Sequence, residues 1–257
     1  MIYFIGAGPG DPELITVRGQ KLLQQAHCVI YAGSLVNPAL LALCRPTCRI
    51  HNSASMTLEE VLEVMLEMEK TASVTVRLHT GDPSMYGAIR EQMDRLDEGG
   101  IPFEVVPGVS SFQGAAAALH AEYTLPGVSQ TLILTRMAGR TPVPEPESIR
   151  NLAGVGASMV VFLSAGMLEQ LQQELLAGGY ASDTPAAIVY KATWPEEKIL
   201  RTKLSDLAHA GREAGISKTA LILVGGFLGS AYDRSLLYHP LFTHGFREGE
   251  KAPVEES

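Results

Sequence analysis

Apolar and polar positions alternate with two different periods along the first 115 residues. Short runs of about five apolar, mostly β-branched residues predict buried strands at residues 2–6, 28–32, 74–79 and 103–108. Helical spacing of apolar side chains predicts helices within residues 14–26 and 57–70, and Thr57 with Glu60 forms a capping box for the second. This alternation is typical of βα units that build a mostly parallel sheet.

A second series of apolar runs follows, and it differs in its connections. Further strands are predicted at residues 131–136, 158–164, 186–192, 198–204 and 219–226. The short turn TWPEE joins the third and fourth runs, which favours a hairpin over a crossover and hence a mixed sheet. We therefore expect two α/β domains, residues 1–120 and 121–245, with a ligand cleft between them. A flexible tail is expected at 246–257, because its last eleven residues are charged and lack large apolar groups.

Composition and charge narrow the class of protein. The chain has 257 residues, enough for two hydrophobic cores, and its formal net charge of −8 argues against a nucleic-acid binder with a broad basic surface. Because no apolar stretch reaches the roughly 18 residues of a spanning helix and the first strand lacks a basic leader, we expect a cytoplasmic protein without a membrane partner. Cys28, Cys44 and Cys48 lack the further ligands of a metal site, which predicts reduced thiols and no metal.

The first glycine-rich loop, GAGPGD at residues 6–11, resembles a dinucleotide loop only in part. The third glycine of that fingerprint is replaced by Asp11, and Pro9 removes a backbone N–H that would bind a pyrophosphate. A ligand that is uncharged or cationic at this point would be tolerated, and a purely structural turn explains the loop equally well.

Two further loops follow predicted strands at their carboxyl ends, where open α/β sheets bind ligands. HTGDPSMYGAI begins at His79, and VVPGVSS precedes an alanine-rich helix. Ser110 or Ser111 either caps that helix or offers a hydroxyl to a ligand.

These motifs together resemble the tetrapyrrole methylase family. The resemblance is carried by GAGPGDPELIT, YAGSLV, HTGDPSMYGAI, VVPGVSS, ILTRMAGRTPVPE and IVYKATWPEEKI, and it runs from about residue 2 to 228. Within the family, YAGSLV, LTR-x-x-GRTPVPE and YKATWP resemble the members that methylate carbon 11 of precorrin-4 or its cobalt form in cobalamin synthesis.

The resemblance implies a two-domain, homodimeric enzyme that uses S-adenosyl-L-methionine and releases S-adenosyl-L-homocysteine. Its cofactor contacts, made mostly by backbone groups, carry over to Pro9, Gly81, Asp82, Pro83, Tyr86, Ser110, Ser111, Leu163, Ala192 and Ala220. Leu163 stands where relatives often have methionine, so its contact is the least defined in detail.

Methyl transfer from a sulfonium needs alignment more than a nucleophile of the protein. Tyr86 and His79 are candidates for a general base, with packing or turn formation as the alternative. A tetrapyrrole substrate carries several carboxylates, so we expect positive charge near it, although ordinary solvated charge explains the same residues. The candidate substrate contacts are Asp11, Arg90, Arg136, Arg140 and Lys191. Trp194 either lines the macrocycle or belongs to the core or a dimer interface.

Other functions stay open at this point. Within the family, the acceptor could be another precorrin position or another tetrapyrrole such as uroporphyrinogen III, because fold and cofactor do not fix it. A nicotinamide-dependent oxidoreductase is a remote alternative, against which Pro9 and Asp11 weigh. A non-catalytic module that senses S-adenosylmethionine is a third.

Overall fold

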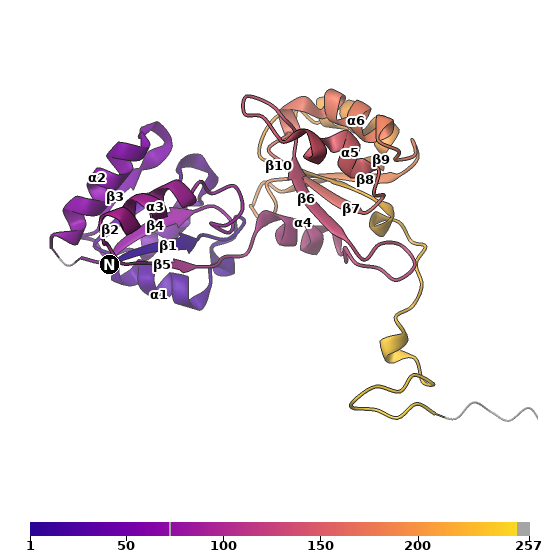
Figure 1. Ribbon diagram of the computed structural model, residues 1–257, viewed down its shortest axis with the longest axis horizontal. Helices are drawn as coiled ribbons and strands as arrows, with labels where there is room; N and C mark the ends of the chain where they lie inside the picture. Colours follow the sequence, from indigo (N-terminus) through magenta and orange to yellow (C-terminus); the bar gives the residue numbers. More distant parts are fainter. Residues whose placement is uncertain (72, 251–257) are drawn as a thin grey trace, which may run out of the picture. The chain divides into compact units, whose positions relative to one another are not determined.

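The computed structural model describes residues 1–71 and 73–250, so residues 251–257 of the tail predicted at 246–257 lie outside the described residues (Figure 1). Contacts between residues divide the chain into two compact units. The first consists of Met1–His120, Ile188–Leu200 and Ile216–Leu221; the second consists of Ala121–Ala187, Arg201–Gly215 and Ile222–Ser257. The division of the chain into domains at residue 120 stays a prediction, and the contacts add two later segments to the first unit.

The first sheet is parallel throughout. Its strands are β1 (Ile2–Gly6), β2 (Cys28–Tyr31), β3 (Arg49–Asn52), β4 (Thr75–His79) and β5 (Phe103–Val106). They are arranged in the order β3-β2-β4-β1-β5. Apolar periodicity did not predict β3, because this edge strand is largely exposed and reads RIHN.

Helices cover both faces of this sheet (Figure 1). They are α1 (Val17–Gln25), α2 (Leu58–Glu69) and α3 (Arg90–Glu98). A fourth helix, α4 (Ser111–Leu119), follows β5 in the chain. Leu23 of α1 packs against one face with Ile5, whereas Met65 of α2 and Leu96 of α3 pack against the other with Phe4. The capping box predicted at the start of α2 is confirmed.

The second sheet is mixed, as the sequence predicts. Its strands are β6 (Leu132–Arg136), β7 (Ser158–Phe162), β8 (Pro185–Tyr190), β9 (Lys198–Lys203) and β10 (Ala220–Val224). In the order β6-β7-β10-β8-β9, β6 and β7 are parallel while β7 and β10 are antiparallel. The neighbours β8 and β9 are joined by residues 191–197, a connection too short for a parallel crossover, so they form the expected hairpin.

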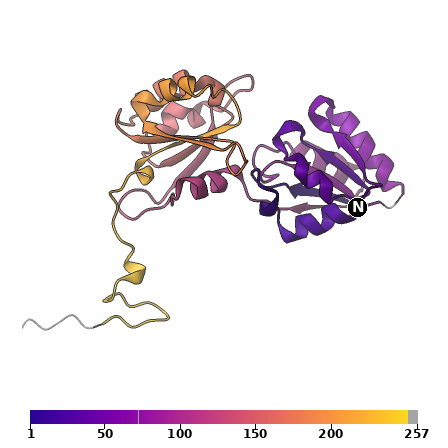
Figure 2. The same ribbon diagram turned by 180° about the vertical axis from the view of Figure 1, so that it is seen from behind.

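The remaining α-helices of the described chain lie side by side over one face of the second sheet (Figures 1 and 2). They are α5 (Ile149–Ala153), α6 (Leu168–Ala177) and α7 (Leu207–Glu213). Within residues 1–71 and 73–250, the structure has no helix with the length and apolar character needed to cross a membrane.

Candidate functional site

Three loops of the first unit meet where β1, β4 and β5 end. The backbones of Gly8 and Gly81 pair directly, with N–H to carbonyl distances of 3.3 and 2.8 Å. A Cβ on Gly108 would lie 2.2 Å from the Gly81 carbonyl oxygen, and one on Gly6 would lie 2.5 Å from the Gly108 Cα. Because such distances are far below van der Waals contact, only glycine permits this approach of three backbones.

Asp82 joins the second of these loops to the third. Its Oδ2 accepts a 2.7 Å hydrogen bond from the Gly108 amide, and its Oδ1 accepts one of 2.9 Å from the Ser84 amide and another from the Ser84 hydroxyl. Hydrogen bonds to a charged acceptor are stronger than neutral ones. The Asp82 carboxylate is therefore directed at the protein backbone and fixes the junction of the loops.

The first loop is held from outside by side chains that come from distant parts of the chain. The Trp194 Nε1 donates to the Pro9 carbonyl at 3.0 Å, and a Cβ on Gly10 would lie only 2.1 Å from the indole Cδ1. The Asn37 amide donates to the Gly10 carbonyl at 2.8 Å. Trp194 therefore packs on the glycine loop, and Gly10 is required for that contact.

Asp11 ends this loop, and its carboxylate has a local role. Its Oδ1 accepts from the Glu13 amide at 2.9 Å, which caps the short 3-10 helix Pro12–Leu14. Its backbone amide donates to the Thr193 hydroxyl at 3.0 Å. Both contacts shape the loop.

Ser110 and Ser111 lie at the start of α4. Ser110 is buried and is the N-cap residue, and its amide donates to the Gln113 side chain at 2.8 Å in a capping box. Gly114, one turn further, lies against Thr193 and Pro9, since a Cβ there would be 3.0 Å from Thr193 Cγ2. The helix cap thus accounts for Ser110, while Ser111 is the first helical residue.

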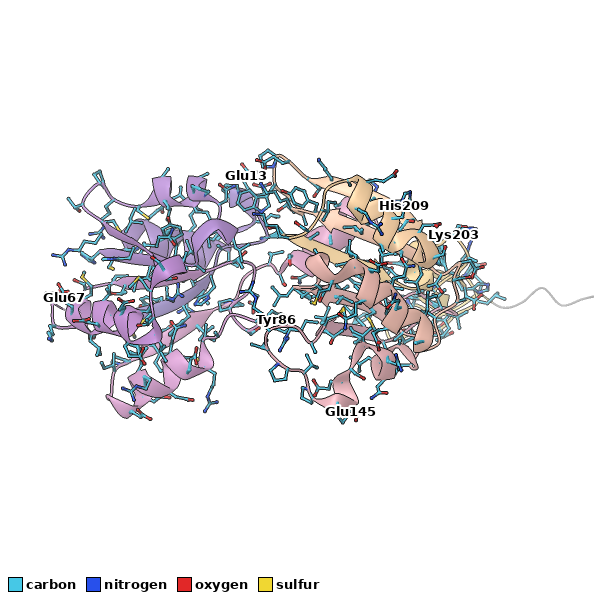
Figure 3. All side chains as sticks on the ribbon, turned by 90° about the horizontal axis from the view of Figure 1, so that it is seen from above. Glu13, Glu67, Tyr86, Glu145, Lys203 and His209 are labelled. Carbon is cyan, nitrogen blue, oxygen red and sulfur yellow. The ribbon has the colours of Figure 1, made fainter. Side chains whose placement is uncertain are left out.

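The loop after β4 carries Tyr86 in a strained conformation. Tyr86, which Figure 3 labels, has a φ of 57°, in the left-handed region that disfavours residues with a Cβ, and the residue is 44% exposed. Gly87 follows where a Cβ would lie 2.2 Å from the Pro83 carbonyl oxygen, and Pro83 itself is buried. Strain of about 1–3 kcal/mol per residue is retained in proteins chiefly at functional positions.

His79 lies in the core. It is 3% exposed, stacks on Phe4 with ring centroids 6.2 Å apart, and its Nε2 has no hydrogen-bond partner in the described chain. Burial and the neighbouring Arg77 charge lower the pKa of His79 to about 3. At neutral pH it is therefore an uncharged and weakly basic imidazole.

Lys191 is strained too, with Ala192 next to it and Ala220 on the segment with which it pairs. Lys191 has a φ of 47°, and its amide donates to the Thr219 carbonyl at 2.9 Å; Ala192 and Ala220 are buried. The Lys191 ammonium lies 3.6 Å from a Glu196 carboxylate oxygen and 5.2 Å from the Trp194 ring centroid. Its charge is thus already partly compensated within the protein.

Leu163 belongs to the second unit and is strained in the same way. It has a φ of 53°, and 65% of it is exposed although it is a large apolar residue. The buried Ser164 hydroxyl beside it donates to the Phe162 carbonyl and accepts from the Met137 amide. The turn that exposes Leu163 is therefore fixed from both sides.

The predicted arginines differ in what they bind. Arg136 donates to the carbonyls of Met137, Thr141 and Pro142 at 3.1, 3.2 and 2.7 Å, so it holds the loop that follows β6. Arg140 lies on that loop, exposed and without an ion pair in the described chain. The Arg90 side chain is 85% exposed and pairs with Asp94 on α3 at 2.7 Å.

The described residues contain no group of three or more His, Cys, Asp or Glu side chains placed to hold a metal ion. Cys28, Cys44 and Cys48 are free. Burial raises the pKa of Cys44 to about 12 and that of Cys28 to about 11, so both are protonated thiols at neutral pH.

Sequence reasoning missed several groups that shape the site. Asn37 and Thr193 hold the first loop, and the Gly108 amide binds Asp82. The Asn37–Pro38 pair is a recognisable cap signal, but no local pattern indicates that its amide reaches Gly10.

Comparison with known proteins adds independent information. The model for tetrapyrrole (corrin/porphyrin) methylases matches residues 1–208. A cobalt-precorrin-4 C(11)-methyltransferase of Methanocaldococcus jannaschii is 49% identical over 251 residues, covering 97% of both chains. A precorrin-4 C(11)-methyltransferase of Pseudomonas aeruginosa is 44% identical over 250 residues, covering 97% of this chain and 99% of the other.

Solved structures agree with this comparison. The X-ray structure of a cobalt precorrin-4 methyltransferase, described as a cobalamin biosynthetic enzyme, matches with a TM-score of 0.87 and 50% identity over 89% of this chain and 96% of the other. A Thermus thermophilus uroporphyrin-III C-methyltransferase complexed with S-adenosylhomocysteine matches with a TM-score of 0.75 and 30% identity, covering 88% and 98%.

Proposed function

This chain belongs to the tetrapyrrole (corrin/porphyrin) methylase family, and from this premise we propose that it methylates carbon 11 of cobalt-precorrin-4 in cobalamin biosynthesis. The methyl donor is S-adenosyl-L-methionine, and the product is S-adenosyl-L-homocysteine. The observation that carries the assignment is the 49% identity to a cobalt-precorrin-4 C(11)-methyltransferase over nearly the whole of both chains.

The substrate is either the cobalt-bound or the metal-free form of precorrin-4. Identity is 49% to the relative named for the cobalt form and 44% to the one named for the metal-free form. This difference supports the cobalt form. Because the described residues hold no metal-ligand cluster of their own, cobalt would arrive with the macrocycle as part of the substrate.

The loops of the first unit suit S-adenosylmethionine. Backbone groups and glycines dominate them, and two hydrogen bonds fix their conformation: Trp194 donates to the Pro9 carbonyl, and the Gly108 amide donates to the Asp82 carboxylate. A sulfonium ligand needs no pyrophosphate cradle, which fits a loop with Pro9 in place of an N–H donor. The proposed cofactor contacts are Pro9, Gly81, Asp82, Pro83, Tyr86, Ser110, Ser111, Leu163, Ala192 and Ala220.

When bound by these residues, the cofactor would supply an activated methyl group to the ring carbon, with S-adenosyl-L-homocysteine as the leaving group. The protein's contribution is then to align donor and acceptor and to exclude water. Tyr86 is exposed on its strained turn, and we assign it as the candidate general base beside the reacting groups. His79 is buried with a pKa of about 3, so we assign it to packing under that loop rather than to base catalysis.

The substrate carboxylates require cations that are accessible. Arg140 is exposed and meets this requirement. Arg136 would act indirectly, because its bonds to three carbonyls hold the loop that carries Arg140. Arg90 and Lys191 would need to exchange Asp94 and Glu196 for substrate carboxylates, and Asp11 would contribute through its loop. The family resemblance further supports a homodimer, whose mass light scattering would measure. The cytoplasmic location stays a prediction from the sequence.

Two measurements test the proposal. Calorimetry should show binding of S-adenosylhomocysteine and no binding of NAD; binding of NAD alone would refute the methyltransferase assignment. Incubation with cobalt-precorrin-4 and carbon-13-labelled S-adenosylmethionine should add one methyl group, located by NMR. A label on any other carbon would overturn the position while leaving the family intact, and faster turnover of metal-free precorrin-4 would overturn the choice of the cobalt form.

A further inference from the structure

A charged side chain lies in the core of the first sheet. Arg77 is at the middle of the central strand β4, and it is 7% exposed. Its Nε donates to Gln92 Oε1 and its Nη1 to the Ile30 carbonyl, both at 3.1 Å. Among the described residues it has no carboxylate partner.

Burial of the Arg77 charge lowers the stability of the fold. A buried charge whose partners are neutral recovers only part of the solvation that it loses, and this loss is on the order of several kcal/mol per ion. Burial accordingly lowers the pKa of Arg77 to about 10, which still leaves it charged at neutral pH. Stability alone therefore does not explain an arginine here.

Gln92 connects Arg77 to the loop that carries Tyr86. Gln92 is 5% exposed on α3, and its Nε2 donates to the Ala88 carbonyl at 2.9 Å. An arginine side chain has only donors, so the amide oxygen of Gln92 must face Arg77 and its NH2 group must face Ala88. The guanidinium thus selects one of the two orientations of the Gln92 amide.

The bond from Gln92 ends on strained backbone. Ala88 has a φ of 49° and Tyr86 a φ of 57°, both left-handed, with Gly87 between them. Residues with a Cβ persist in this region only where surrounding contacts fix them. The Ala88 carbonyl is one of the points at which this turn is held from the core.

We propose that Arg77 and Gln92 are positioning residues, which act through the Ala88 carbonyl to hold the Tyr86 turn in the conformation that receives the cofactor. The inference rests on the proposed function for the cofactor role of Tyr86. Arg77 orients the Gln92 amide, and Gln92 holds the turn; neither touches the cofactor.

Two substitutions separate this role from simple packing. Gln92→Glu keeps, and strengthens, the bond to Arg77, but it replaces the NH2 donor by an oxygen facing the Ala88 carbonyl. Arg77→Met keeps much of the volume and removes the group that orients Gln92. The matched controls are Gln25→Glu on α1 and Arg95→Met on α3, both exposed.

The expected result is a loss of order in the turn without a loss of fold. Gln92→Glu should unfold at the wild-type temperature or above, exchange the amide hydrogens of residues 84–89 several-fold faster in the unliganded protein, and bind S-adenosylhomocysteine about five-fold more weakly. KM for S-adenosylmethionine should rise more than kcat falls. Arg77→Met should likewise speed the amide exchange of residues 84–89 and weaken the binding of S-adenosylhomocysteine. Both controls should match wild type.

Wild-type amide exchange in Gln92→Glu would overturn the positioning role, as would faster exchange combined with unchanged affinity. If wild type binds no S-adenosylhomocysteine, the proposed function fails. In that case, faster exchange in both variants would still support the hold on the turn, and unchanged exchange would refute it.

Discussion

Replacing Asp82 by asparagine tests whether the junction of the glycine loops organises the cofactor site. The carboxylate uses both oxygens: Oδ2 accepts from the Gly108 amide at 2.7 Å, while Oδ1 accepts from the amide and the hydroxyl of Ser84. An asparagine side chain has one oxygen and one NH2 group, so it can satisfy only one of these two sides.

The loss can be worked out from these bonds. If the asparagine oxygen faces Gly108, its NH2 group faces the Ser84 amide, and two donors then oppose each other. A hydrogen bond to a charged group contributes about 1.5–3 kcal/mol, so we expect Asp82→Asn to lower the free energy of unfolding by about 2 kcal/mol. Gly108 lies against the Gly6 and Gly81 backbones, so displacement there should also weaken binding of S-adenosylhomocysteine by about ten-fold.

Urea unfolding and calorimetry measure the two effects separately. Ser84→Ala removes only the hydroxyl donor and should cost about 1 kcal/mol, while Asp97→Asn, on an exposed residue of α3, is the control that should change nothing. Wild-type affinity in a folded Asp82→Asn variant would show that the junction does not organise the site.

Other changes should act in directions that the structure defines. Trp194→Phe keeps the apolar cover of Gly10 but loses the 3.0 Å bond to the Pro9 carbonyl, so unfolding should be easier by about 1 kcal/mol and S-adenosylhomocysteine should bind a few-fold more weakly by calorimetry; an unchanged affinity would refute a role of this bond in the site. Leu163→Gly relieves left-handed strain at an exposed residue, so the melting temperature should hold or rise while affinity for S-adenosylhomocysteine falls; loss of stability instead would contradict the strain argument. Because the pKa of His79 is about 3 in the fold and about 6.5 in an unfolded chain, the unfolded state binds more protons between these values, and this contribution to stability is complete above pH 6.5 and lost on acidification toward pH 3. His79→Leu should therefore remove about 2 kcal/mol of the destabilisation that wild type shows in urea between pH 7 and 5, and an equal slope in both proteins would be the contrary result. Met65→Leu, fully buried in the core that α2 covers, should leave turnover nearly unchanged and cost less than about 1.5 kcal/mol, whereas a large loss of activity would point to a role beyond packing.

The parts of the fold that were predictable are those that short stretches of chain specify. The strands of both sheets other than β3 follow from runs of apolar residues, and the capping box of α2 follows from Thr57 and Glu60, three residues apart. Strand β3 was not predicted, because an exposed edge strand need not bury alternate side chains.

The candidate site was predictable in its loops but not in its contacts. The glycines at the ends of β1 and β4 and the proline in place of a donor indicated backbone-lined loops and argued against a pyrophosphate. The pairing of Lys191 with Glu196, the loop carbonyls bound by Arg136 and the burial of His79 were not visible, and each of them changes the chemistry that the side chain can perform.

Residue periodicity and motif order were enough to define this protein as an α/β chain of two sheets whose loops resemble those of tetrapyrrole methylases. Both signals depend only on residues that are close together in the sequence. The three-dimensional structure alone decided which polar groups meet. Trp194 reaches the Pro9 carbonyl across 185 positions of the chain, and Arg77 reaches Ala88 only through Gln92 on another element. Hydrogen bonds of this kind depend on distances of about 3 Å that packing establishes after the strands and helices have formed, and no local pattern encodes them.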